Sequence, residues 1–328
     1  MADVSRRRLR EADRAQLFLV GALALSVIFV VLAVLLNTAI YTGNIATRDP
    51  GPGTDEVVEY EGEAASVAGT TLTTVNDRNN SSYAELRSTY GNTIAVWSET
   101  ANAHKVADLA DAHLSIVTTN RGSKIGQEQQ NGFVNDTGGG NWTVANDTAA
   151  RAFRMNVTQS SLFDTTSGAL SESFYVGFND SSGEWKAYVY QNGGSNVSVD
   201  VIYPNGTQVG STCSVDAGAN DHAVIELSSA RIGGQPCPAF TKLFRGLSAP
   251  YNVTYTNALD NSANEQIDGT YSVVVDRRLT NLETGADENS GEPYAAPALY
   301  SADLQVTYRS SVVTYRTNLR VAPEEPDV

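Results

Sequence analysis

Three histidines are the residues of this sequence most suited to moving protons or binding a metal ion. His104 and His113 stand nine residues apart, and on a helix this spacing places them on opposite faces, where they cannot share a metal. His222 follows Asp221, but neighbouring side chains of a strand point to opposite faces, and no G-x-S-x-G nucleophile turn occurs. Because no nucleophile, base and orienting residue can be named together, we predict that the protein is not an enzyme.

Two acidic loops and one glycine-rich loop are the remaining places where an ion or a phosphate could bind. "DENSGE" from Asp287 and "DSSGE" from Asp180 lack the ligand spacing of an EF-hand loop, so we interpret both as solvated loops. "TGGGN" from Thr137 lacks the Lys-Ser/Thr pair that follows a phosphate-binding loop. We therefore predict neither a cofactor nor a metal site.

The only two cysteines of the sequence, Cys213 and Cys237, lie in its C-terminal half. An oxidising compartment would favour a disulfide between them, whereas two cysteines at this spacing supply too few ligands for a metal site. We predict the disulfide, with free thiols as the alternative.

Asn-x-Ser/Thr sequences are about twice as frequent as chance would give in a chain of this composition, and they are acceptors for N-glycosylation. Because Asn, Ser and Thr are also common in turns, part of this excess needs no glycan to explain it. The candidate acceptors are Asn79, Asn80, Asn135, Asn141, Asn146, Asn156, Asn179, Asn196, Asn205 and Asn252.

Charge is distributed unevenly along the chain, which has 22 basic and 37 acidic residues and a net charge of −15. An acidic surface with few lysines suits a solvent of high salt, where repulsion between carboxylates is screened; we interpret the protein as halophilic, with an ordinary acidic secreted domain as the alternative. The absence of a basic patch argues against nucleic acid as a partner. The clustered cations are Arg6, Arg7, Arg8, Arg10 and Arg14, all near the N-terminus.

An uncharged segment follows these arginines, and its core from Leu17 to Leu36 would measure about 30 Å as a helix, the thickness of a bilayer's hydrocarbon layer. The run is longer than the apolar part of a secretory signal and has no clear cleavage site after it. The excess of arginine before it predicts a single-pass protein of the cell membrane, with a cytoplasmic N-terminus and an extracellular C-terminal part. Its first partner is then the lipid bilayer.

Arg14-Ala15-Gln16 followed by an apolar helix resembles the start of archaeal type IV pilins and flagellins, and "RAQLFLVGALAL" with "LLNTAIYTGNIATR" resembles a haloarchaeal family of pilin-like membrane proteins. The resemblance covers about residues 13–48. It implies processing by a prepilin peptidase between Ala15 and Gln16, and assembly with other pilin-like subunits. One departure is Val20, which occupies the position where bacterial pilins carry an acidic residue.

Two functional hypotheses follow from this N-terminus. In the first, the protein is a pilin-like or accessory subunit of a type IV pilus-like system. In the second, the leader is kept, and the protein is a permanently anchored envelope protein whose extracellular domain binds or adheres without forming filaments.

The segments expected around these residues form an α+β fold. The predicted order is a basic cytoplasmic leader (1–14), a transmembrane or assembly helix (15–48), a helical stalk (54–119), a Gly/Asn-rich linker or loop (120–150), an antiparallel β-sandwich (151–321) and a disordered tail (322–328). Apolar residues every three or four positions predict two stalk helices, and Ser82 with Glu85 forms a capping-box signature between them. Beyond Arg151, alternation with a period of two and turn dipeptides such as Asn192-Gly193 predict many short strands.

Overall fold

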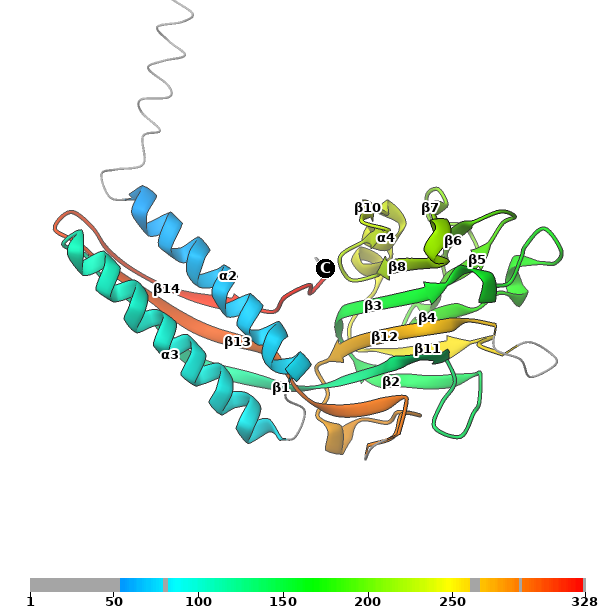
Figure 1. Ribbon diagram of the computed structural model, residues 1–328, viewed down its shortest axis with the longest axis horizontal. Helices are drawn as coiled ribbons and strands as arrows, with labels where there is room; N and C mark the ends of the chain where they lie inside the picture. The colour runs from blue at the N-terminus through cyan, green and yellow to red at the C-terminus, as the bar shows by residue number, and fades with distance from the viewer. Residues whose placement is uncertain (1–53, 79–81, 260–265, 289–290, 327–328) are drawn as a thin grey trace, which may run out of the picture. The chain divides into compact units, whose positions relative to one another are not determined.

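The computed structural model describes residues 54–78, 82–259, 266–288 and 291–326 (Figure 1). The chain divides into two units, Met1–Glu56 and Val57–Val328, and nearly all described residues belong to the second. In the described ranges its fold is α+β, with three α-helices and two antiparallel sheets, part of which form a sandwich.

The first two helices confirm the helical spacing of the sequence. They are α2 (Thr54–Arg78) and α3 (Tyr83–Ala107). Ser82 is the N-cap of α3, and its side chain accepts a hydrogen bond from the amide of Glu85, which satisfies one of the free donors at the helix start. Each helix buries one stripe of side chains: Val57, Tyr60, Ala64, Ala68, Leu72 and Val75 from α2, and Leu86, Tyr90 and Ile94 from α3.

The prediction that helix continues to residue 119 is wrong, because α3 ends at Ala107 and a 22-residue strand, β1 (Asp111–Gly132), begins four residues later. The β-branched run from Ile116 to Thr119 favours extended backbone. Two side chains of α3 also bind this strand, since Asn102 accepts from the amide of Ala112 and Ser98 from that of Leu114. β12 pairs with β1 only from Ser123 onward. In the earlier part of β1, these two side chains of α3 bind backbone amides that β12 does not reach.

The strands that the structure describes form one eight-stranded and one six-stranded sheet, and every ladder between them is antiparallel. The larger sheet has the order β10 (Gln235–Pro236), β9 (Arg231–Ile232), β8 (His222–Glu226), β3 (Ala150–Thr158), β12 (Asp268–Val275), β1, β13 (Tyr294–Arg309) and β14 (Thr314–Val321). The smaller has the order β2 (Trp142–Thr148), β11 (Tyr251–Thr256), β4 (Tyr175–Asp180), β5 (Gly183–Gln191), β6 (Asn196–Ile202) and β7 (Cys213–Asp216). A further helix, α4 (Pro238–Gly246), precedes β11.

The linker predicted over 120–150 is also wrong, because β1 continues to Gly132 and β2 occupies Trp142–Thr148. Glycine in this part of β1 allows close packing of the backbone and does not mark a flexible linker. A Cβ at Gly122 would lie 2.2 Å from the carbonyl oxygen of Val275, and one at Gly126 would lie 2.8 Å from that of Tyr271. Here glycine lets neighbouring strands approach, a role that composition alone does not distinguish from a linker.

The two larger hydrophobic cores of the described residues are built on the same long strands. One fills the sandwich between the two sheets and includes Ile125 of β1 and Ala295 of β13. The other packs α2 and α3 on the opposite ends of these strands, at Leu114 and Leu304. β1 and β13 pair from Asp111↔Arg309 to Gly126↔Tyr294 with two register shifts, so the helical part and the sandwich share one sheet instead of being joined by a linker (Figure 1).

The predicted disorder of the tail is contradicted for residues 322–326, which are held by polar contacts. The guanidinium of Arg151 donates to the carbonyl of Pro323, and the amide of Ala152 donates to that of Glu324. The carboxylate of Glu325 accepts from Tyr300 and pairs with Arg320. The segment has few apolar side chains to bury, so its residue pattern does not predict this attachment.

Candidate functional site

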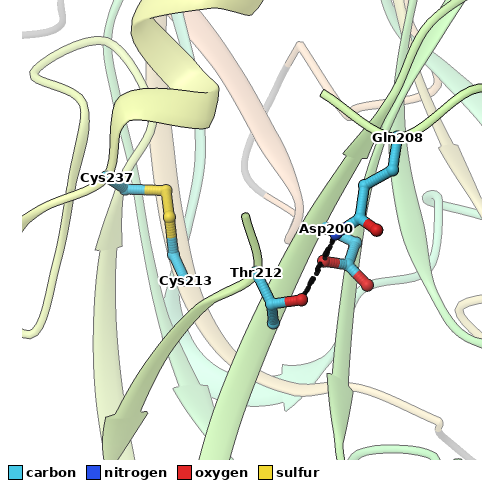
Figure 2. Close-up of a disulfide and its surroundings, with 5 residues drawn as sticks. All are labelled: Asp200, Gln208, Thr212, Cys213 and Cys237. Atoms are coloured by element: carbon cyan, nitrogen blue, oxygen red, sulfur yellow. Dashed lines mark hydrogen bonds between the residues drawn. A yellow bond between two sulfur atoms is a disulfide. The ribbon is translucent and has the colours of Figure 1, made fainter. Parts of the chain in front are cut away.

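Cys213 and Cys237 form a disulfide that joins the edge strand β7 to the start of α4 (Figure 2). Cys213 is the first residue of β7, and Cys237 is the N-cap of α4. Both residues are buried at the border of the sandwich core. The described cysteines therefore perform a structural task.

A buried carboxylate lies near this disulfide, on the adjoining strand β6 (Figure 2). Oδ1 of Asp200 accepts from Nε2 of Gln208 at 2.6 Å and from the hydroxyl of Thr212 at 2.7 Å, while Oδ2 accepts from the hydroxyl of Tyr190 at 2.9 Å. Burial, and then the bond to Asp200, raises the pKa of Tyr190 to about 12. Two of these three donors, Gln208 and Thr212, lie in the segment just before Cys213. Asp200 therefore holds this segment in place.

The candidate glycosylation sites differ in how much of each asparagine reaches solvent. Asn79 and Asn80 lie outside the described residues. Asn252 on β11 and Asn179 on β4 are directly opposite each other on neighbouring strands, and both are exposed. The other exposed acceptors are Asn141, Asn196 and Asn205, whereas Asn135, Asn146 and Asn156 are half-buried.

Two of these sites share a tight local geometry. The side-chain oxygen of Asn205 accepts from both the amide and the hydroxyl of Thr207, and Asn135 accepts in the same way from Thr137. This arrangement is an Asx-turn, in which the asparagine side chain imitates a backbone turn. At Asn146 the side-chain nitrogen instead donates to Glu283, so the atom that would carry a glycan is already bound.

The histidines and acidic loops do not assemble a catalytic or metal site in the part of the chain that the structure describes. The hydroxyl of Ser160 donates directly to the carboxylate of Asp221, with no imidazole between them. Nε2 of His113 lies 2.8 Å from Asp111 on an exposed part of β1. Across the described ranges, no group of three or more His, Cys, Asp or Glu side chains is placed to hold a metal ion.

A polar depression of about 330 Å³ lies over β1, β3, β12 and β13. Lys124 at its border pairs with Asp77, and the hydroxyl of Tyr294 donates to Glu128. Arg154 and Asn156 of β3 complete its polar lining. Its residues come from four strands far apart in the chain, so no single stretch of the sequence predicts it.

The sites on which the membrane prediction rests lie outside the described residues. These are Ala15 and Gln16 at the expected processing point and the span from Leu17 to Leu36. Of the helices within residues 54–326 that the structure describes, none is both long enough and apolar enough to cross a bilayer.

Comparisons with protein-family models, with curated proteins and with solved structures found no match to this chain.

Proposed function

We propose that the protein is a membrane-anchored structural protein of the cell surface, and that it acts as a pilin-like or accessory subunit of a type IV pilus-like system. The observation that carries this proposal is the N-terminus: five arginines, the tripeptide Arg14-Ala15-Gln16 and a 20-residue apolar core from Leu17 to Leu36. The arginines would remain in the cytoplasm, and residues 54–328 would lie outside the cell.

The described unit has two features that suit an extracellular position. A disulfide persists in oxidising surroundings and is rare in the cytosol. Five of the candidate acceptor asparagines are exposed, two of them side by side on β4 and β11. The acidic, lysine-poor composition further supports a halophilic host, in which high salt screens the repulsion between carboxylates.

The test of this function is the N-terminal residue of the protein recovered from membranes of its host, identified by mass spectrometry. Processing between Ala15 and Gln16 would leave Gln16 as the first residue. A matched variant, Ala15→Leu, replaces the small residue at the cleavage point and leaves the apolar core unchanged. We expect this variant to stay in the membrane with its leader attached.

Two other results would change the proposal. An intact leader through Arg14 in the unmodified protein would favour the permanently anchored protein with a binding or adhesive domain. Release from the membrane by alkaline carbonate would contradict both hypotheses, because an integral helix resists this extraction.

A further inference from the structure

Three large apolar side chains lie at one end of the helical part, and together they are called the apolar tip: Val106, Leu109 and Val312. Their exposed fractions are 55%, 86% and 63%. The other large apolar side chains that are comparably exposed in the described ranges are Val58, Val96 and Val117. Exposed apolar residues are ordinary when scattered, but a group at one place indicates contact with something apolar.

The tip is defined by two chain segments that meet where β1 begins. Asp111 of β1 pairs with Arg309 of β13, so the end of α3 and the turn between β13 and β14 lie next to each other. Figure 1 shows the end of α3, this turn and the start of α2 at the same end of the sheet.

Leu109 is the most exposed member and has a backbone that leucine rarely adopts. It follows the C-cap Asp108 with φ of 60°, in the left-handed region. The amide of Ala110 donates to the carbonyl of Lys105 and that of Leu109 to Val106, which is the Schellman arrangement that most often has glycine at this position. Neither the helix end nor the core requires a leucine here.

The chain outside the described structure enters the fold at this same end. α2 begins at Thr54, and the apolar core of the N-terminal segment ends at Leu36. The 17 residues between them, 37–53, span at most about 60 Å when fully extended. If residues 17–36 cross the bilayer, this short connection keeps the tip at a high effective concentration near the lipid surface, so a weak contact is sufficient.

We propose that the apolar tip contacts the outer interface of the lipid bilayer. This inference rests on the proposed membrane anchor and adds a second, reversible contact to it. Asp108 and Asp111 flank Leu109 in the chain, so attraction to anionic lipid does not drive the contact. Burial of apolar side chains drives it, and salt strengthens it by screening the repulsion between these carboxylates and the lipid phosphates.

The test uses the full-length chain in vesicles of anionic phospholipid, with a single cysteine labelled by an environment-sensitive dye. The described cysteines are both in the disulfide, so an introduced thiol is labelled selectively. Val106→Cys and Leu109→Cys report on the tip. Val96→Cys is the matched control, since Val96 is 64% exposed on the same helix and about 15 Å from Val106.

We expect lipids carrying a spin-label quencher to reduce the dye emission at positions 106 and 109 at least twofold more than at position 96, and the difference to grow from 0.1 M to 2 M salt. Equal quenching at all three positions in vesicle-bound protein would overturn the tip contact and leave the anchor intact. Self-quenching of the dye that rises with protein density, without lipid quenching, would overturn it in favour of contact between copies. Failure of the chain to float with vesicles would refute the anchor and the tip contact together.

Discussion

Arg151 is a cation with almost no access to solvent, 1% exposed, and it connects three parts of the chain. Its guanidinium donates to the carbonyls of Leu299, Tyr300 and Pro323 and lies over the ring of Tyr300. The pairing of β13 with β1 shifts register at this point, so carbonyl groups there need other donors. Burial lowers the pKa of Arg151 to about 10, while the three acceptors and nearby Glu325 stabilise its charged form.

The substitution Arg151→Lys should lower the free energy of unfolding by about 2–3 kcal/mol, because one ammonium group cannot reach three carbonyls in the plane of the guanidinium and leaves some of them unpaired. Urea unfolding at neutral pH measures the change. Arg154→Lys is the control on the same strand, where the side chain is exposed and the expected change is below about 0.5 kcal/mol. Equal effects of the two substitutions would refute the role given to Arg151.

Among the elements, α2, α3 and most of the sandwich strands were predictable from periodicity, whereas α4 was not predicted. The stripe from Val57 to Val75 has helical spacing because α2 buries one face, and the alternation of Val197, Val199 and Val201 matches β6. β1 was missed because glycines and a polar run, Gln127 to Gln130, interrupt its alternation. Its extended conformation depends on pairing with β12 and β13, whose sequences lie more than 130 residues away.

The candidate sites also divide into those that the sequence predicts and those that it does not. The cysteine pair could be anticipated from count and compartment, and the structure joins it. The Asp200 cluster, the attachment of the tail by Arg151 and the polar depression could not, because each is made by side chains that only the folded sheets bring together. The expected processing point at Ala15 and Gln16 lies outside the described residues and stays a prediction.

Loss of the disulfide should destabilise the element pair β7 and α4. Reduction opens a loop whose ends are 24 residues apart, for which chain entropy gives up to about 3.5 kcal/mol of lost stability. Unfolding by urea with and without reductant measures this change in the unmodified protein. In the double variant Cys213→Ala/Cys237→Ala the reductant should have no effect, and an unchanged stability of the unmodified protein under reduction would contradict the prediction.

At the scale of the whole molecule, the sandwich is centred on an aromatic cluster that contains tyrosine hydroxyls. Tyr255 packs 5.2 Å from Tyr271 and also against Phe133, Phe174 and Trp142, and Tyr271 packs against Phe133. Neither hydroxyl has a hydrogen-bond partner among the described residues. Burial raises the pKa of both tyrosines well above the ordinary value, because ionisation would place a charge in the core.

The stability of the protein should therefore fall steeply above pH 10. Unfolded tyrosines lose their protons near pH 10 while the buried ones keep theirs, so the stabilising difference is complete below pH 10 and is lost as pH rises toward the folded pKa. Each such tyrosine contributes up to about 1.4 kcal/mol per pH unit. Urea unfolding at pH 8, 10 and 11 measures the slope.

Tyr255→Phe is the matched variant for this slope. It removes one titrating group and an unpaired buried hydroxyl, so the slope above pH 10 should decrease, and stability at pH 7 should be unchanged or higher by up to about 1 kcal/mol. A slope equal to that of the unmodified protein would show that Tyr255 does not contribute to the loss.

The long pairing of β1 with β13 also has a mechanical consequence. The helical core is built on one end of these strands and the sandwich core on the other, so a tensile force that draws the two cores apart acts along the strand direction. Because both strands belong to both cores, the covalent backbones of β1 and β13 carry this force in parallel, and no hydrogen bond of their ladder has to open for the force to pass from one core to the other. Resistance to pulling is thus built into the same sheet that holds the two cores together.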